Sequence, residues 1–210
     1  MDYPVLNRTP DVAQAMVPHS LDGSGNAVPH SLVAPPPVLY FPKAINAAAS
    51  AMTRPANATP YAAGDAVSNN GTAASVTPIS FAASDLTDAP VLLTHLEILS
   101  NDSGPAAAGA TFEAWLFNSD PTANGGVGGG DNAAFSQKQA GFIGRMSGNF
   151  IAASDGSLAM LTPIDGSFVG GRPAAGGTTV YALLKTMTAF TPSAGGTTFS
   201  CTLRGVQGRA

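Results

Sequence analysis

The sequence has a single cysteine, Cys201, and only three histidines among its 210 residues. An internal disulfide is therefore excluded, and a zinc cage of cysteine and histidine ligands is not expected. Charged residues make up 10% of the chain, against roughly a quarter in ordinary soluble domains, which excludes long exposed helices stabilised by ion pairs. The fold must be held together by packing or by association between copies.

Clusters of charge and long apolar stretches are also missing. Nine basic and thirteen acidic side chains provide neither a phosphate-binding stripe nor a polybasic patch, so we expect no nucleic acid and no membrane among the partners. The uncharged stretches 23–42 and 186–203 contain too many Pro, Gly and hydroxyl residues for a membrane helix. The sequence opens without a basic segment followed by an apolar one, so we expect no secretory signal and synthesis in a cytoplasm.

Proline is concentrated at the start of the chain, where eight of the 17 prolines fall within the first 42 residues. Proline interrupts both helices and sheet ladders and favours extended backbone in the residue before it. Residues 1–51 are therefore expected to form an extended arm, with a polyproline II stretch ending in an apolar tip at 38–41. The Ala-rich segment Ile45 to Met52 predicts one or two helical turns that join the arm to the body, 52–210.

A five-residue sequence, VPHSL, occurs at 17–21 and again at 28–32. Two tethered copies can dock into equivalent grooves of a repeating partner, because the first contact raises the effective concentration of the second. A chance duplication in a low-complexity tail explains the repeat equally well. On the first interpretation the partner-binding residues of the arm are Val17, Pro18, His19, Leu21, Val28, Pro29, His30, Leu32, Pro36, Leu39, Tyr40 and Phe41.

The body alternates short β-branched and aromatic runs with clusters of Gly, Pro, Asn and Asp, which is typical of an all-β sandwich or barrel. About eight strands joined by such turns predict a jelly-roll-like β-sandwich. The glycine-rich run 125–130 is interpreted as a loop between strands, with Asp131 as the N-cap of a single helical turn. The strands are expected at 65–67, 74–81, 91–99, 111–117, 141–146, 158–161, 179–187 and 197–206.

Residues that could carry catalysis are few, and none forms a complete set. Alternation in 91–99 places His95, Glu97 and Leu99 on one face, where His95 and Glu97 are interpreted as a hydrogen-bonded surface pair. Glu97 and Glu113 could be the paired carboxylates of a glycosidase only if their strands are adjacent. Cys201 lies within an apolar strand and is expected to be a small core residue. We therefore expect no enzyme, no cofactor and no metal.

Several segments resemble a family of small tailed-phage virion proteins. The opening of the body, 53–67, reads TRPANATPYAAGDAV and is similar to the first segment of these proteins. The later segments WLFNSDP at 115–121 and DNAAF at 131–135 resemble a strand-to-loop stretch of the family. YALL at 181–184, followed by FTP at 190–192, is similar to its last hairpin. The resemblance extends from about Thr53 to Val206 and leaves the arm unmatched.

The resemblance implies a capsid decoration or cement protein with a jelly-roll body. Such a protein is made in the bacterial cytoplasm, binds the major capsid protein on the outside of the virion and bridges capsomers without catalysing a reaction. We expect self-association as a homotrimer, because many weak contacts sum across a lattice. An alternative is a tail or fibre component that binds a host-surface glycan through Trp115, Tyr181 and the loop 125–130. A carbohydrate-active enzyme is a third class, which depends on Glu97.

Overall fold

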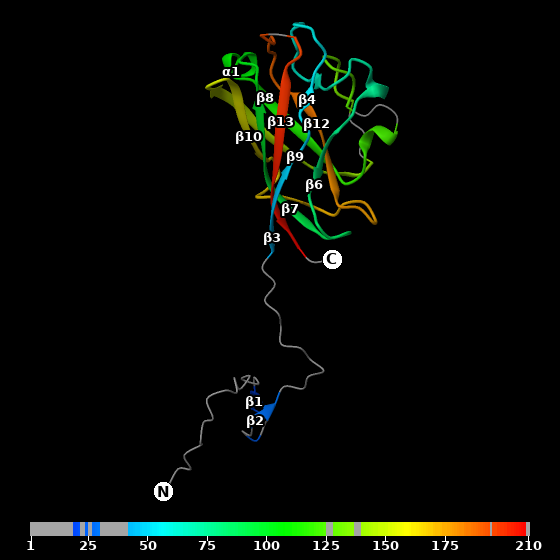
Figure 1. Ribbon diagram of the computed structural model, residues 1–210, viewed down its shortest axis with the longest axis vertical. Coiled ribbons are helices and arrows are strands. Elements are labelled where there is room, and N and C mark those ends of the chain that lie inside the picture. Colours follow the sequence, from blue (N-terminus) through cyan, green and yellow to red (C-terminus); the bar gives the residue numbers. More distant parts are fainter. Residues whose placement is uncertain are drawn as a thin grey trace, which may run out of the picture. The chain divides into compact units, whose positions relative to one another are not determined.

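The computed structural model describes residues 19–21, 24, 27–29, 42–124, 128–136, 140–193 and 195–208 (Figure 1). The chain divides into two units, Met1–Phe41 and Pro42–Ala210. In the first unit, β1 (His19–Leu21) and β2 (Ala27–Pro29) form a short antiparallel hairpin. The second unit is the body, and it contains all the other helices and strands described below.

The body is almost entirely antiparallel β-structure, with three helical segments of only three or four residues: η1 (Ala73–Ser75), α1 (Gly104–Ala107) and η2 (Pro121–Asn124). Its strands are β3 (Lys43–Ala48), β4 (Met52–Thr53), β5 (Ala66–Val67), β6 (Ile79–Ala82), β7 (Val91–Ser100), β8 (Thr111–Phe117), β9 (Phe142–Ala153), β10 (Gly156–Pro163), β11 (Val169–Gly171), β12 (Thr179–Thr186) and β13 (Thr198–Gln207).

The order of the strands is that of a jelly roll. Neighbouring strands follow the order β3-β13-β7-β10-β9-β8-β12, and β6 lies against the other side of β12. These eight strands, counted along the chain, lie in the order 1-8-3-6-5-4-7-2. This double Greek-key order leaves few free sheet edges, because only β3 and β6, the first two of the eight strands, lie at the ends of the strand order. The expected all-β jelly-roll sandwich is confirmed.

The long strand β9 connects the two layers of the sandwich. Its first part pairs with β8 and its second part with β10, and Met146 and Ser147 take part in both ladders. One layer therefore contains β3, β13, β7 and β10, and the other contains β8, β12 and β6 (Figure 1). Between the layers lies a core in which Phe112 contacts Phe150, Phe190 and Phe199, with ring centroids 4.7, 5.5 and 5.9 Å apart.

All eight expected strands are present, although their bounds differ where tertiary contacts extend or shorten them. The strand 111–117 has the bounds that its alternation predicts. The strand expected at 74–81 begins only at Ile79, because 73–75 forms a 3-10 turn. The strand expected at 141–146 continues to Ala153, where a two-residue turn at 154–155 leads back into β10.

The helical joint expected at Ile45 to Met52 is wrong, because this segment forms β3 and β4. Ile45 and Ala47 point into the core, and β3 pairs with the last strand, β13, along 43–48. The high helix propensity of alanine is small beside this burial and the ladder of backbone hydrogen bonds. The body therefore begins at Pro42 rather than at residue 52, and the arm ends at Phe41.

Candidate functional site

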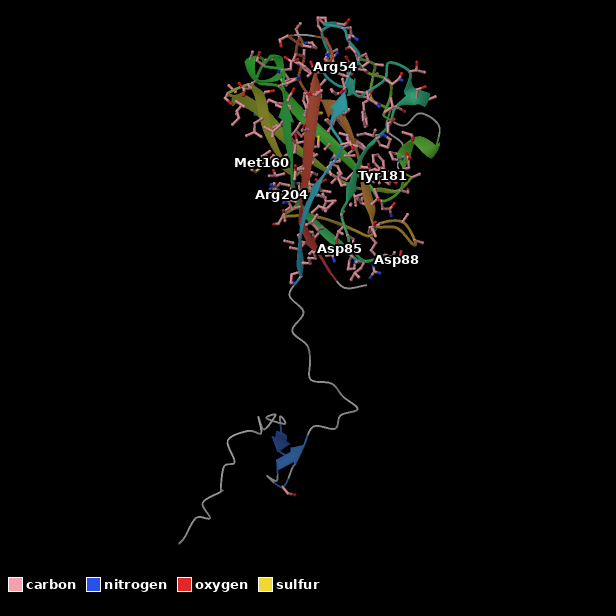
Figure 2. The ribbon with its side chains drawn as sticks, in the orientation of Figure 1. Arg54, Asp85, Asp88, Met160, Tyr181 and Arg204 are labelled. Carbon is pink, nitrogen blue, oxygen red and sulfur yellow. The ribbon has the colours of Figure 1, made fainter. Side chains whose placement is uncertain are left out.

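The most tightly organised polar group of the body joins Arg54, Tyr61 and Asp131 near one end of the sandwich (Figure 2). Arg54 Nε donates to the Tyr61 hydroxyl at 2.6 Å, and this hydroxyl donates to Asp131 Oδ1 at 2.5 Å. Arg54 Nη2 lies 3.3 Å from Asp131 Oδ2, with both side chains at most 1% exposed. Asn57 accepts the remaining guanidinium hydrogen bonds through its backbone and side-chain oxygens. We call these four residues the Arg54 cluster.

The electrostatics of the Arg54 cluster keep its charges paired. Burial, together with the hydrogen bond and the charge of Asp131, raises the pKa of the Tyr61 hydroxyl far above its usual range, so Tyr61 stays a proton donor. The Tyr61 ring stacks on Phe190 at 4.7 Å, which fixes the position of the hydroxyl. Asp131 also accepts from the Ser68 backbone N–H at 3.1 Å. The N-cap role expected for Asp131 is wrong, since its oxygens bind Arg54, Tyr61 and Ser68, and 131–136 forms no helix.

The Arg54 cluster brings together two segments on which the family resemblance rests. Backbone hydrogen bonds link 64–66 to 132–135: Phe135 N–H donates to Gly64, Asn132 N–H to Ala66, and Ala66 N–H to Ala133. The segments 53–67 and 131–135 therefore form one structural unit, although they lie far apart in the sequence. Asp131 and Ser68, the residue after the first segment, are hydrogen-bonded and lie 63 positions apart. Arg54 and Asp131 have no catalytic geometry here, because each is fully engaged in holding the loop.

The partner-binding residues expected in the arm are described only in part. His19, Leu21, Val28 and Pro29 lie in the β1–β2 hairpin, where Ser20 pairs with Val28 and His19 with Pro29. The two copies of the repeat thus contribute strands to a single hairpin. The other expected residues lie outside the described part of the chain: Val17, Pro18, His30, Leu32, Pro36, Leu39, Tyr40 and Phe41.

His95 and Glu97 lie on the outer side of β7, as the alternation predicts. Leu96 and Ile98 are fully buried on the opposite side of this strand. Glu97 faces Arg204 of β13, with Oε2 3.5 Å from Nη2, and His95 Nδ1 lies 3.2 Å from the Thr94 hydroxyl. The carboxylate is therefore paired with Arg204 across the strands rather than held by the imidazole.

The strands of Glu97 and Glu113 are not adjacent, contrary to what a glycosidase pair requires. Two strands, β10 and β9, separate β7 from β8, and β7 and β8 lie in different layers of the sandwich, which pack about 10 Å apart. Glu97 and Glu113 are both carried on the outer sides of their layers, so their carboxylates lie farther apart than that. Glycosidase pairs lie roughly 5 to 9.5 Å apart. Glu113 is buried and paired with Arg145 at 2.8 Å, with Lys185 Nζ at 4.0 Å. This pair of glutamates does not form a glycosidase site.

Cys201 is a core residue, as expected. It lies on β13 and is 1% exposed. Burial raises the pKa of the thiol to about 12, so almost no thiolate is present at neutral pH. The side chain fills space between the two layers and is not a nucleophile.

Trp115 is covered by neighbouring aromatic side chains. It points outward from β8, away from the main core, and packs against Phe135 and Phe142 with ring centroids 5.4 and 5.0 Å apart. The Arg145 guanidinium lies over its ring at 5.6 Å. Trp115 is only 5% exposed, so its ring cannot serve as a platform on which a sugar stacks. Of the loop 125–130, only 128–130 belongs to the described residues.

Two shallow hollows follow the seam where the free edges of the sandwich meet. One, of about 400 Å³, lies between β4 with its preceding turn and residues 77–80. The other, of about 190 Å³, lies between 43–46 and 82–85, beside the ion pair of Lys43 with Asp85. The larger hollow is lined by no titratable side chain, and the smaller has a cation and an anion that already neutralise each other. Neither hollow assembles an acid, a base and a nucleophile.

In the part of the chain that the structure describes, no group of three or more His, Cys, Asp or Glu side chains is placed so that it could hold a metal ion. Within the same residues, no helix has the length and apolar character needed to cross a bilayer.

Comparison with known proteins gives no relative: neither the models of known protein families nor the curated proteins match this chain.

The Arg54 cluster is not recognisable from the sequence as an interacting group. The only signals were an arginine in an otherwise uncharged stretch and an aspartate after a glycine run. Nothing in their spacing indicates that they meet, because the contact depends on the path of the loop between β8 and β9. A concentration of exposed apolar side chains on the outer side of β7, β10 and β9 was likewise not expected from the sequence.

Proposed function

We propose that this chain is a non-enzymatic structural protein of a tailed-phage virion, which decorates the outer capsid surface and stabilises the shell by bridging capsomers. The supporting observation is the Arg54 cluster. Its residues come from two of the segments of the body that resemble the phage family, 53–67 and 131–135, and they lie in direct contact. Two segments that resemble the family and also build one buried unit support an architecture shared with that family better than two unconnected segments would.

The physical character of the body supports the same role. A decoration protein has to persist outside the cell as a rigid platform, and a jelly roll with a closely packed aromatic core provides this rigidity. The low content of charged residues favours broad contact with protein surfaces over ionic ligands. In this proposal the major capsid protein is the partner, the chain self-associates as a homotrimer, and the arm reaches neighbouring capsomers.

The alternative, a tail or fibre component that binds a glycan, is less well supported. Lectin-type sites present an aromatic ring to the sugar, whereas Trp115 lies beneath Phe135 and Phe142. Tyr181 is partly buried and packs against the same group of side chains. These contacts leave neither ring free as a flat binding surface.

The experiment that tests the proposal compares two binding partners. The full chain is incubated with purified phage shells that lack it and, separately, with host cell envelopes, and the bound fraction is measured after sedimentation. We expect saturable binding to shells at a fixed ratio to the capsid protein, and a higher melting temperature of the decorated shells. Binding to envelopes without binding to shells would overturn the proposal in favour of the tail or fibre role. Absence of binding to either would also overturn it.

A further inference from the structure

Exposed apolar side chains are concentrated on one side of the body. The structure places eight large apolar side chains in exposed positions among the described residues, and six of them belong to β7, β9, β10 or the turn between β10 and β11. These six are between 40% and 61% exposed. We call them the outer face, which consists of Leu92, Leu99, Ile151, Met160, Ile164 and Phe168.

The strand register makes these side chains neighbours. Leu158 pairs with Leu99 on one side and with Ile151 on the other, so the three residues form a row across β7, β10 and β9. Met160, two residues further along β10, points to the same side and is labelled in Figure 2. Paired side chains on one face of a sheet lie about 5 Å apart. This part of the outer face is therefore a continuous apolar surface.

The far end of the outer face continues the same pattern. Leu92 pairs with Gly170, and a Cβ atom placed on Gly170 would be in ordinary van der Waals contact with both Leu92 and Phe168. Ile164 extends β10 past its last residue, with its N–H donating to Arg145. Six side chains of this size at about half exposure present on the order of 600 Å² of apolar surface, at the upper limit of what monomers leave exposed.

The charges around the outer face are already balanced. Glu97 and Arg204 form a pair beside Met160, and Asp165 lies 3.6 Å from Arg145 beside Ile164. A partner that is recognised by its charge needs a patch of unmatched charge, whereas here the two ion pairs are matched and the single carboxylate of Asp155 borders the surface in the turn between β9 and β10. A neutral apolar surface with one ion pair at each end can instead bind the same surface of a second copy. When a two-fold rotation relates the two copies, each cation of one copy can face an anion of the other.

We propose that the outer face binds a second copy of this chain. The inference goes beyond the homotrimer of the proposed function, because a face that meets the same face of a second copy forms a two-fold contact and not a three-fold one. Two sheets packed face to face lie about 10 Å apart with interdigitating side chains, and Leu99, Ile151 and Met160 have the length to fill that space. A standard interface buries about 800 Å² on each partner, so the apolar part of the outer face would supply most of it.

The test measures the association of the full chain by sedimentation equilibrium over a range of concentrations. The variant carries Ile151→Asp and Met160→Asp, and the control is Leu86→Asp, at an exposed leucine outside the outer face, in the loop between β6 and β7. We expect the wild-type chain and the control to associate, and the dissociation constant of the double variant to rise by about 100-fold or more. Thermal unfolding of all three proteins establishes that the variants are folded.

Two results would overturn the inference. One is a wild-type chain that stays monomeric at about 100 µM, well above the concentration at which a standard interface forms. The other is a folded double variant that associates as tightly as the wild type. The same proteins are then mixed with phage shells. Shell binding tests only the proposed virion role, and sedimentation equilibrium tests only the self-association. A negative result for one proposal can therefore be distinguished from a negative result for the other.

Discussion

The Tyr61 hydroxyl and the Asp131 carboxylate lie 2.5 Å apart, although 70 positions separate the two residues in the sequence. The hydroxyl is both acceptor from Arg54 and donor to Asp131, so it completes a chain of hydrogen bonds between a buried cation and a buried anion. A buried charge is tolerated only when it is paired and hydrogen-bonded. The contact thus ties the loop before β9 to the start of the body.

Removing the anion of this cluster should strongly destabilise the body. We expect Asp131→Asn to lower the free energy of unfolding by about 3 to 5 kcal/mol, because the Arg54 cation stays buried without its counter-charge. The measurement is urea denaturation followed by tryptophan fluorescence. Asp155→Asn, in the exposed turn between β9 and β10, is the matched control and should change stability by less than about 0.5 kcal/mol. Equal effects of the two substitutions would contradict the assignment.

Asp102 should make stability depend on pH in the acid range. Burial by itself would raise the pKa of this carboxyl, but hydrogen bonds from Ser193, from the Gly104 N–H and from Thr197 outweigh it and hold the pKa below its usual value. A carboxylate whose pKa is lowered by folding stabilises the native state above its unfolded pKa of about 4, and this contribution is lost as the pH falls through the folded pKa.

The variant Asp102→Asn tests this dependence. We expect it to be less stable than the wild type at pH 7, and the difference between the two proteins to shrink as the pH falls below about 4. Urea denaturation at a series of pH values measures the difference. A difference that stays constant from pH 7 to pH 2 would show that the ionised form of Asp102 contributes nothing.

Gly130 should be intolerant of any side chain. A Cβ atom there would lie 2.0 Å from the backbone oxygen of Gly71, whereas a Cβ on Gly71 itself would meet nothing within 4 Å. We expect Gly130→Ala to lower the free energy of unfolding by about 1 to 3 kcal/mol, because the Asp131 loop is displaced. Gly71→Ala is the control and should have little effect. A difference of less than about 0.5 kcal/mol between the two variants would rule out the close approach.

Where the arm is cut should decide whether the body folds. We expect a chain lacking 1–41 to unfold cooperatively near the wild-type temperature, because the body begins at Pro42. A chain lacking 1–51 also loses β3, the partner of β13, and should be strongly destabilised or aggregate through the exposed edge. Circular dichroism during heating distinguishes them. Mixed with shells, the chain lacking 1–41 should bind more weakly than the full chain if the arm bridges capsomers.

Much of the fold could be predicted from the sequence because the body is built from local signals. In 198–207 apolar and polar residues alternate, and in 111–117 one face is apolar while the other is mixed. Such a period of two indicates a strand with at least one face in the core. Clusters of Gly, Asn, Ser and Asp mark the turns between such runs, as in Ser154-Asp155-Gly156. These patterns depend on near neighbours alone, so seven of the eight jelly-roll strands and the all-β class follow from them.

The first strand of the jelly roll and the Arg54 cluster could not be predicted in this way. The segment 43–48 is rich in alanine, and it becomes a strand only because β13, from the other end of the chain, provides its hydrogen bonds. The partners of Arg54 likewise depend on which strands become neighbours. The same is true of the row in which Leu158 pairs with Leu99 on one side and with Ile151 on the other. The sequence by itself determined where the chain extends and turns. The tertiary structure decided which distant residues meet, because only the strand order closes those distances.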